Sequence, residues 1–494
     1  MQCPNCGQDI GIKREFCPAC GKRVDVAFDQ IAASVHVDAA ARRGQNLERF
    51  LGWGLMALIA VGVVILGINH LWDRPLVYDG AELAAMDAPV VPLVPPPQLQ
   101  AVSRNPFRLS LPPGQAPKVF ANRQDPFKSE LRIANGGTTE VEAAIENGLR
   151  FLVGRQNRDG SWTPGYKSKR ILPTRDETQA HQWTQTGLTA LALLAFLGEG
   201  RTWHETNVKG GRQNQGKCIE QAIRFLVNSQ DEINGRYGPA QGNFMYNHGL
   251  ATLAIAEAAG LSGDKHLRES AQKGVILIQN AQHPSGGWKY KDEISGNADT
   301  SVTSWQVQAL LTASEIGLKV NPEVLNKSLD FLRKVTEPNG QVRYDLQDRA
   351  AFSPPGVALM MRRWLGETDS GALRLLTRKT LEGLPRSEKS WGRGWKEAAK
   401  DIDHDKRARI FDPYAWFYGT YGAFFQGGDD WKLWHSGPAG AQTAEVKVGL
   451  VPALLDLQDT DGGWYANDKW TVKVGEVYST ALCVLALQAY YRVH

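Results

Sequence analysis

The sequence has little net charge and few cysteines for its length. Its 56 Lys and Arg residues nearly balance its 52 Asp and Glu residues, which leaves a net charge of +4 over 494 residues. Nucleic-acid-binding domains usually carry a basic stripe, so this balance gives no argument for a nucleic-acid partner. Only six cysteines are present, and four of them lie in the first twenty residues. This distribution excludes the disulfide framework of a small secreted protein.

The four N-terminal cysteines form two C-x2-C pairs: Cys3, Cys6, Cys17 and Cys20. Four thiolates at this spacing can occupy the corners of a tetrahedron, which is the geometry of structural Zn²⁺. A redox dithiol would be expected beside a βαβ pattern, which is missing here. We therefore predict a zinc ribbon over residues 1–25, similar to the small ribbons at the N-termini of many bacterial membrane proteins. Because four Cys ligands close the coordination shell, the zinc is expected to be structural.

A second N-terminal stretch contains no charged residue. Residues 50–69 are uncharged over twenty positions, which is long enough for a helix to span a bilayer. We predict a transmembrane helix over residues 50–72, with tryptophans near both of its ends. Arg42, Arg43 and Arg49 precede this segment, and acidic residues follow it. The positive-inside rule then predicts a single-pass protein of the cell membrane, with a cytoplasmic N-terminus and an extracytoplasmic C-terminal part.

Proline dominates the next segment. Residues 75–126 contain eleven prolines, and such a stretch cannot form a helix or a central strand. We predict an extended linker, which reaches roughly 3 Å per residue where it adopts polyproline II.

The rest of the chain is repetitive. Over residues 135–494, amphipathic helical segments alternate with segments that are apolar on all sides, as Leu188 to Leu197 illustrates. Glycine-aromatic turns separate them at six places: Trp162, Tyr237, Trp288, Tyr344, Trp395 and Trp464. Six repeats of this kind can close into a ring, with the apolar helices inside and the amphipathic helices outside. The predicted fold class is therefore all-α, a single (α/α)6 toroid of six helical hairpins.

Three of these turns carry a specific pattern. Its best copy is Gly148, Phe151, Leu152, Gln156, Gly160 and Trp162; a second is Gly274, Leu277, Ile278, Gln282, Gly286 and Trp288; and Gln458, Gly462 and Trp464 keep its last part. The pattern resembles the repeat of squalene–hopene and oxidosqualene cyclases. By this resemblance the chain is similar to the terpenoid-cyclase and protein-prenyltransferase toroid superfamily, including uncharacterised bacterial repeat proteins. The resemblance implies that each Gln caps a neighbouring helix and that each Trp stacks on it.

Two catalytic signatures of that superfamily are incomplete in this sequence. The D-x-D-D-T motif of cyclases corresponds to Gly296–Thr300, where Ala298 replaces the aspartic acid that donates the proton. The D-x-C pair of the zinc site in protein prenyltransferases does not occur in the chain. The resemblance therefore favours neither cyclisation started by protonation nor zinc-dependent prenyl transfer.

In a toroid, the loops that enter the inner helices face the central cavity. These entries are rich in aromatic and polar residues: His181, Trp183, Tyr246, His248, Asp299, Trp305, Asp412, Tyr414, Trp416, Tyr418 and Tyr478. From them we predict a ligand cavity formed by Tyr246, His248, Asp299, Trp305, Tyr414, Trp416 and Tyr478. An alternative remains open, in which these rings fill the throat of the toroid and Asp299 caps a helix.

The predicted function is a binding or scaffolding module outside the membrane, with no cyclase activity and with structural zinc as its cofactor. Its ligand would be a small molecule, a lipid or a glycan that the sequence does not identify. The alternative is an envelope enzyme that acts on an isoprenoid lipid or on a polysaccharide. The shape also resembles toroids of some polysaccharide lyases, and in that case Tyr246 and His248 would act as base and acid.

Overall fold

The computed structural model describes residues 120–164, 182–203, 213–294, 296–347, 352–368, 370–388, 411–466, 468 and 470–492. These residues all belong to the unit of the chain that spans Pro96–His494. The predicted zinc ribbon, the transmembrane helix and the linker as far as residue 119 lie outside the described residues. Within the described ranges, no helix is long and apolar enough to cross a membrane.

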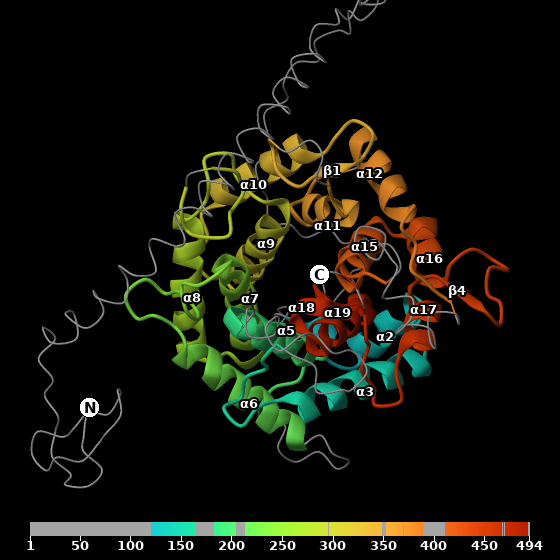
Figure 1. Ribbon diagram of the computed structural model, residues 1–494, viewed down its shortest axis with the longest axis horizontal. Coiled ribbons are helices and arrows are strands. Elements are labelled where there is room, and N and C mark those ends of the chain that lie inside the picture. Colours follow the sequence, from blue (N-terminus) through green and yellow to red (C-terminus); the bar gives the residue numbers. More distant parts are fainter. Residues whose placement is uncertain are drawn as a thin grey trace, which may run out of the picture. The chain divides into compact units, whose positions relative to one another are not determined.

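The described helices form two concentric rings (Figure 1). The inner ring consists of α5 (Gln185–Gly198), α7 (Phe244–Ser262), α9 (Thr300–Glu315), α11 (Pro355–Trp364), α15 (Pro413–Gln426) and α19 (Glu476–Leu487). The outer ring consists of α3 (Thr139–Arg155), α6 (Gln213–Asn228), α8 (Lys265–Asn280), α10 (Pro322–Val335), α12 (Gly371–Leu381) and α17 (Leu450–Leu457). Outer and inner helices alternate along the chain, as the sequence predicts for helical hairpins. The ring closes where α19 packs against α5 and α17 packs against α3.

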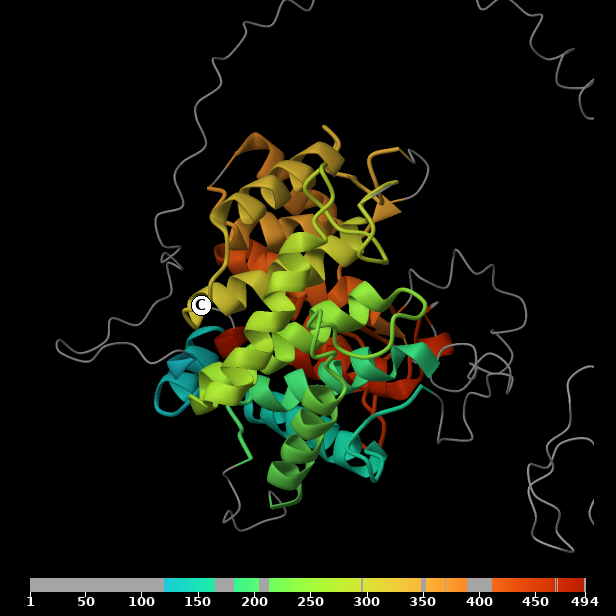
Figure 2. The same ribbon diagram turned by 90° about the vertical axis from the view of Figure 1, so that its left-hand side faces the viewer.

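The pattern of buried residues agrees with the arrangement of the helices in two rings. In α5, every residue from Thr186 to Gly198 is buried, because α5 contacts α7 and α19 on its sides and α6 on its outer face. In the outer helix α3, buried residues such as Val141, Ile145 and Leu152 fall on one side of the helix. Figure 2 shows this layering from the side of α8.

The glutamines of the repeated turns connect neighbouring outer helices. Gln156 Nε2 donates to the carbonyl oxygen of Gly160 within its own turn and to that of Cys218 in α6, at 3.0 and 2.8 Å. Gln282 makes the same pair of bonds, to its own turn and to Val324 of α10. Since a carbonyl group in a helix can accept a second hydrogen bond, each glutamine ties one repeat to the next without breaking a helical bond.

The tryptophans of these turns lie in the core. The Trp162 indole N–H donates to the carbonyl oxygen of Leu152 at 2.9 Å, and its backbone N–H donates to the Thr189 hydroxyl at 3.0 Å. Trp288 and Trp464 repeat both bonds at the corresponding positions. Each tryptophan therefore fastens the end of an outer helix to the beginning of the inner helix that follows.

The fourth turn differs from the prediction, which placed its anchoring aromatic residue at Tyr344. The backbone bonds from Glu337 to Gln341 and from Gly340 to Glu337 reproduce the pattern of the other turns. In this register the buried residue at the tryptophan position is Val342, which is fully buried, and Thr336 stands at the glutamine position. Trp395, the predicted anchor of the fifth turn, lies outside the described residues.

Residues from both ends of the folded part lie together at the C-terminal ends of the inner helices. A short helix η1 (Ala121–Arg123) precedes α2 (Phe127–Ala134), and α20 (Ala489–Arg492) follows α19. Arg123 and Arg492 both donate to the Glu257 carboxylate, at 2.6 and 2.5 Å. All three side chains are 3% exposed. Residues 120–126, which the proline content of the sequence assigns to the linker, therefore belong to the folded part of the chain.

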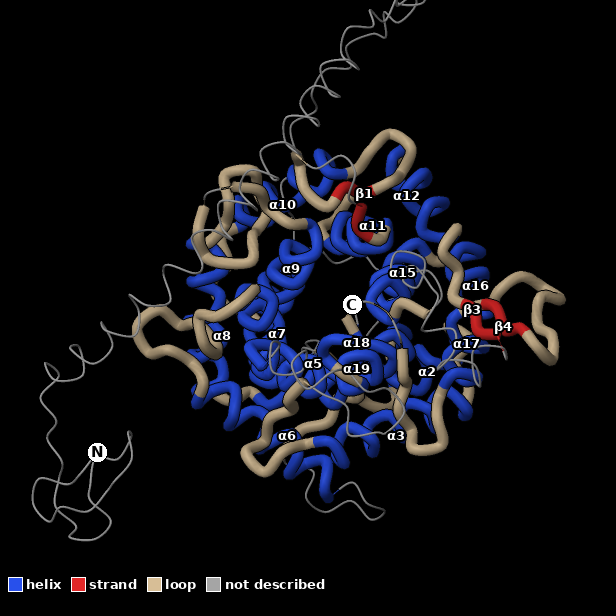
Figure 3. Tube along the Cα trace, in the orientation of Figure 1, coloured by secondary structure: helices blue, strands red, loops and turns tan. Residues whose placement is uncertain are grey.

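The strands of the described residues are short. The strands β1 (Val342–Arg343) and β2 (Phe352–Ser353) form one antiparallel pair. The strands β3 (Arg386–Glu388) and β4 (Val446–Val448) form another, beside α17 (Figure 3). An additional helix, α16 (Gly428–Ser436), packs on α15.

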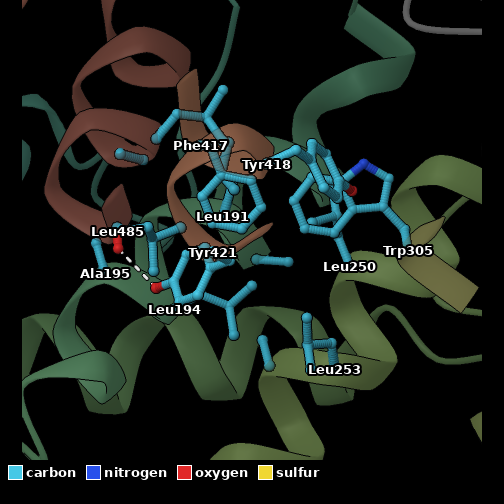
Figure 4. Close-up of a cluster of buried hydrophobic side chains, with 14 of the residues drawn as sticks. Leu191, Leu194, Ala195, Leu250, Leu253, Trp305, Phe417, Tyr418, Tyr421 and Leu485 are labelled. Atoms are coloured by element: carbon cyan, nitrogen blue, oxygen red, sulfur yellow. Dashed lines mark hydrogen bonds between the residues drawn. The ribbon is translucent and has the colours of Figure 1, made fainter. Parts of the chain in front are cut away.

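Side chains fill the middle of the inner ring. Figure 4 shows Leu191 and Leu194 of α5, Leu250 and Leu253 of α7, and Tyr421 of α15 pointing toward one another. The Tyr421 hydroxyl donates to the carbonyl oxygen of Leu485 at 2.7 Å. The ring is therefore closed across its centre by packed side chains.

Candidate functional site

A cavity of about 120 Å³ lies at the N-terminal ends of the inner helices. It is lined by Trp183, Thr184, Gly187, Leu188, Leu191, Tyr246, Asn247, Leu250, Ser301, Trp305, Tyr414, Trp470, Val474 and Tyr478. These residues come from η2 (Gln182–Thr184), from the first two turns of α5, α7, α9, α15 and α19, and from the short helix α18 (Thr471–Val474) with the residue before it. The connections at this end are the longer ones: residues 281–299 join α8 to α9, whereas residues 263 and 264 alone join α7 to α8.

The helical repeat explains which side chains face the cavity. Residues four positions apart lie on the same side of a helix. Tyr246 and Leu250 form such a pair on α7, and Ser301 and Trp305 form another on α9. The wall is thus built from one stripe of each contributing helix.

The floor of the cavity is aromatic. The Trp305 ring stacks on Phe417, with ring centroids 5.6 Å apart and an angle of 19° between the rings. Tyr418 packs edge-on against Trp305, and its hydroxyl group is bonded to Ser304 and Gln308 at 2.6 and 3.1 Å. Trp305 is part of the lining, and Phe417 and Tyr418 pack against it without lining the cavity themselves.

Three hydroxyl groups gather on one wall of the cavity, from Tyr246, Ser301 and Tyr414; we refer to them as the hydroxyl cluster. The Ser301 side chain interacts with both tyrosine hydroxyls. The Tyr414 hydroxyl is buried, yet it makes no hydrogen bond of normal geometry within the described part of the chain. The other polar residues of the lining are Thr184, Asn247 and Tyr478, and the rest of the lining is mostly apolar.

A carboxyl group lies behind this wall. Asp299 caps α9 by accepting a hydrogen bond from the Val302 N–H at 2.7 Å. It also accepts hydrogen bonds from Tyr290 at 3.1 Å and from the cavity residue Tyr246 at 3.5 Å. Burial raises the pKa of Asp299 to about 7. The carboxyl group therefore reaches the cavity through the Tyr246 hydroxyl.

Two further carboxyl groups, of Asp412 and Asp468, lie near enough to the cavity to act on Tyr478. Asp412 caps α15 through the Ala415 N–H at 3.0 Å, and Asp468 accepts from the backbone N–H groups of Trp470 and Thr471 at the start of α18. Burial, followed by the charge of Asp468, raises the pKa of Asp412 to about 7. Burial also raises the pKa of Asp468. Asp468 thereby fixes the segment that carries Trp470 over the cavity.

The structure brings four of the seven predicted cavity residues together in the lining: Tyr246, Trp305, Tyr414 and Tyr478. Asp299 is a neighbour of the lining through its bond to Tyr246. Trp416 is not part of the lining, and its ring packs against Phe411 with centroids 4.8 Å apart. The alternative role of Asp299, capping of a helix, is observed.

His248 does not line the cavity either. Its Nδ1 accepts a hydrogen bond from the Tyr237 backbone N–H at 3.2 Å, and its Nε2 lies 3.1 Å from the carbonyl oxygen of Gly274. The imidazole is fully buried, and burial lowers its pKa to about 4. In this position His248 joins α7 to the turn at Tyr237 and to α8. It is therefore a core residue. A base and acid pair with Tyr246 would require its imidazole to line the cavity, which it does not.

The predicted set contains none of the aliphatic lining residues and not Trp470. The signal for two of them is helical spacing, because Leu188 follows Thr184 by four residues and Leu191 follows Leu188 by three. Trp470 lies outside the inner helices, on a segment that has no helical pattern in the sequence. His181, another predicted cavity entry, lies outside the described residues.

Chemically, the arrangement is suited to holding a compact, mostly apolar group with one polar end. No residue of the described lining carries a charge. A cavity of about 150 Å³ is enough for a benzene-sized molecule, so the occupant's buried part is on the order of one ring or a short branched chain. We find no group of three metal-ligating side chains in the described ranges.

No protein-family model matches the chain. A probable squalene–hopene cyclase of Sinorhizobium fredii is 23% identical over 223 residues, which are 42% of this chain and 31% of that protein. A squalene–hopene cyclase of Bradyrhizobium diazoefficiens is 23% identical over 197 residues, which are 36% of this chain and 27% of that protein. The chain thus spans less than a third of the length of these curated relatives.

Among solved structures, the type II terpene cyclase MstE from Scytonema matches with a TM-score of 0.43 and 14% identity, over 71% of this chain and 97% of that chain. The cellobiose 2-epimerase from Spirochaeta thermophila matches with a TM-score of 0.45 and 13% identity, over 74% of this chain and 99% of that chain. The sequence similarity to cyclases and the double ring of helices support the terpenoid-cyclase-like α/α toroid superfamily. Neither structural similarity identifies a ligand.

Proposed function

We propose that this protein binds the hydrocarbon part of an isoprenoid-type lipid in the cavity at the N-terminal ends of its inner helices. The observation that carries the proposal is the lining itself, in which Leu188, Leu191, Leu250 and Val474 alternate with aromatic rings. Transfer of branched hydrocarbon from water into such a lining is favourable by about 25 cal/mol per Å² of buried apolar surface. The curated relatives are named for squalene, which is a hydrocarbon of this class.

We propose binding without cyclisation. Ala298 stands at the position of the cyclase proton donor and is buried. The neighbouring acid, Asp299, is separated from the cavity by Tyr246. Because burial raises its pKa to about 7, it is a weaker acid than an ordinary carboxylic acid, and protonation of an alkene requires a strong one.

We also propose the cellular setting that the N-terminal sequence predicts. Residues 50–72 would anchor the chain in the membrane, and Cys3, Cys6, Cys17 and Cys20 would hold a structural zinc ion on the cytoplasmic side. The toroid would then stand outside the membrane on the proline-rich linker. A protein arranged in this way could collect a lipid that leaves the outer face of the bilayer.

A polysaccharide is the alternative ligand, because aromatic side chains also stack on sugar rings. A sugar has hydroxyl groups around its whole ring, and burying them in a mostly apolar wall without partners is costly. The aliphatic residues of the described lining, Leu188, Leu191, Leu250 and Val474, offer no partner to a sugar hydroxyl group. This composition favours a lipid.

The test uses the full-length chain in lipid nanodiscs and a fluorescently labelled farnesyl chain, with labelled maltotriose as the comparison. We expect saturable binding of the farnesyl chain above the level of empty nanodiscs, and no saturable binding of the sugar. Leu250→Phe should weaken the farnesyl affinity about tenfold, equivalent to about 1.4 kcal/mol, because the larger ring enters the cavity. Saturable sugar binding without farnesyl binding would refute the proposal.

Leu253→Phe is the matched control for that variant. Leu253 lies one turn further along α7, points into the packed centre in Figure 4 and is not part of the lining. Leu253→Phe overpacks the core and is expected to lower stability by about 1–3 kcal/mol, but it does not fill the cavity. Only Leu250→Phe should weaken binding. Separately, incubation of the wild-type protein with squalene should yield no cyclised product by gas chromatography.

A further inference from the structure

The hydroxyl cluster gives the cavity a polar end, and its chemistry specifies what the lipid carries there. Tyr246, Ser301 and Tyr414 each present a group that can donate one hydrogen bond and accept another. They come from three different inner helices, α7, α9 and α15, so their convergence depends on the closed ring. A polar group of the ligand at this wall would meet both donors and acceptors.

One of these groups is poorly paired. The Tyr414 hydroxyl oxygen is buried and makes no hydrogen bond of normal geometry with the described residues, although the Ser301, Ser304 and Tyr418 hydroxyls lie near enough to interact with it. Tyr418 is already engaged with Ser304 and Gln308. A buried hydroxyl without a hydrogen bond loses its hydration without compensation. A ligand that supplies the missing partner recovers that loss on binding.

The surrounding charges select against an anionic head group. Asp299 lies behind Tyr246, and its negative charge acts on both Tyr246 and Tyr414. Asp412 and Asp468 act in the same way on Tyr478. The helix N-termini behind these residues are already capped by Asp299 and Asp412. An anion placed against this wall would lose its hydration and face carboxyl groups.

We infer that the ligand is a neutral isoprenoid alcohol, held by its hydrocarbon part in the apolar lining and by its hydroxyl group at Tyr414 and Ser301. The inference rests on the proposed function, because it names the head group of the lipid that the cavity would bind. The alcohol oxygen accepts the Tyr414 hydroxyl hydrogen. The alcohol hydrogen is donated either to the Ser301 hydroxyl or to the Tyr246 hydroxyl. In the second case the alcohol joins a chain of hydrogen bonds that runs through Tyr246 to the Asp299 carboxyl group.

Three probes with the same carbon skeleton test the inference: farnesol, the hydrocarbon farnesene and farnesyl diphosphate. Each competes with the labelled farnesyl chain for the full-length protein in nanodiscs. We expect farnesol to bind about fivefold to thirtyfold more tightly than farnesene, the effect of one or two hydrogen bonds of about 1 kcal/mol each. The diphosphate should bind more weakly than farnesol.

Two substitutions test which side chains cause the tighter binding of farnesol. Tyr414→Phe and Ser301→Ala should each bring the farnesol to farnesene affinity ratio toward one, because each removes a hydrogen bond that only farnesol can make. Tyr421→Phe is the matched control, because it removes the same atom two turns further along α15, where the hydroxyl is bonded to the Leu485 carbonyl oxygen. This control should leave the ratio unchanged. Circular dichroism and the melting temperature should show Tyr414→Phe to be at least as stable as the wild type, since it removes a buried hydroxyl without a partner.

The outcomes separate the two proposals. If farnesol and farnesene bind equally well, if Tyr414→Phe and Ser301→Ala leave the ratio at its wild-type value, or if the diphosphate binds most tightly, the alcohol inference is wrong and the lipid-binding function stands. If neither farnesol nor farnesene displaces the label, both are wrong. A preference for farnesol that both cavity variants abolish and Tyr421→Phe preserves establishes the inference.

Discussion

Gln458 and Ala144 are 314 residues apart in the sequence, and the Gln458 side chain donates to the Ala144 carbonyl oxygen at 2.8 Å. This bond joins the turn after α17 to the first outer helix, α3. It is the counterpart of the bonds that Gln156 and Gln282 make to the outer helix that follows each of them. The ring of the toroid is thus closed by the same interaction that links its consecutive repeats.

This relationship predicts the effect of Gln458→Leu. The variant keeps a side chain of similar size and leaves the Ala144 and Gly462 carbonyl groups without their side-chain donor. We expect the free energy of unfolding to fall by about 1–3 kcal/mol, measured by urea denaturation of the full-length protein. Gln272→Leu, at an exposed glutamine on the outer helix α8 that bonds to the backbone of Lys319, is the control and should change stability by less than about 1 kcal/mol. Equal effects of the two substitutions would contradict a special role of the closing bond.

The sequence could predict these turns wherever glutamine, glycine and tryptophan all occur. At the fourth turn the sequence could not predict the buried anchoring residue. Val342 is one of many aliphatic residues, whereas Tyr344, two positions later, is aromatic like the anchors of the other turns. The register was decided by the backbone bonds around Gly340, which no side-chain pattern reveals. Likewise, nothing near Arg123 in the sequence indicates its partner Glu257, so the predicted linker, residues 75–126, extends several residues into the folded part.

Glu257 provides a second prediction. Its carboxylate receives hydrogen bonds from both Arg123 and Arg492, in a site from which water is excluded. Glu257→Gln would leave two buried guanidinium groups without a counter-charge, and removing one partner from a buried ion pair typically costs about 3–5 kcal/mol. The melting temperature of the variant should fall by several degrees. The same change at Glu220, which forms an exposed pair with Arg224 on α6, should have almost no effect, and similar losses at both sites would refute this account.

The cavity was predicted in part, for a reason that lies in helix geometry. Tyr246 and Tyr414 occur in the first turns of inner helices and do line the cavity. His248 and Trp416 are each two residues further on, and at 3.6 residues per turn two residues correspond to a rotation of about 200°. Those two side chains therefore point to the opposite side of their helices, into the core. The closeness of a residue to the start of an inner helix therefore predicts the end of the ring at which the cavity lies. It does not predict which face of the helix borders the cavity.

His248 yields a third prediction, which concerns acid stability. Burial lowers the pKa of His248 to about 4, whereas an unfolded histidine has a pKa of about 6.5. Between these values the unfolded chain binds the proton and the folded chain does not, so this histidine makes the protein less stable as the pH falls from 6.5 to 4. His248→Gln should be less stable than the wild type at pH 7, by about 1–3 kcal/mol for the lost hydrogen bonds, and the difference should shrink at pH 5. A variant that kept wild-type stability but lost farnesyl binding would show instead that His248 serves the cavity.

The N-terminal cysteines give a fourth prediction. The purified full-length protein should contain one equivalent of zinc by mass spectrometry, because the paired C-x2-C spacing supplies a complete set of four ligands. Replacing Cys17 and Cys20 together by serine should remove the zinc. Farnesyl binding should persist in this variant, since the cavity residues lie beyond residue 180. Zinc that remains at one equivalent after the double substitution would contradict the assignment.

Asp299 provides the last prediction, which has the opposite sign from that of His248. Burial raises the pKa of Asp299 to about 7, whereas an unfolded aspartic acid has a pKa of about 3.9. Between these values the folded chain holds a proton that the unfolded chain has released, so the contribution of this group to stability falls as the pH rises from about 4 to 7. Above pH 7 both states are ionised and the loss is complete, on the order of 2–4 kcal/mol.

Asp299→Asn removes this titration while keeping a side chain that caps a helix nearly as well. The difference in unfolding free energy between variant and wild type should be small at pH 4 and should favour the variant increasingly up to pH 8. Urea denaturation at five pH values measures it, and taking the difference cancels the other titrating groups that the two proteins share. A difference that does not change with pH would mean that Asp299 is ionised in the folded protein at pH 4, as an ordinary exposed helix cap would be. The Tyr246 hydroxyl would then donate to a carboxylate throughout that range, and the polar wall of the cavity would carry a full negative charge even in acid.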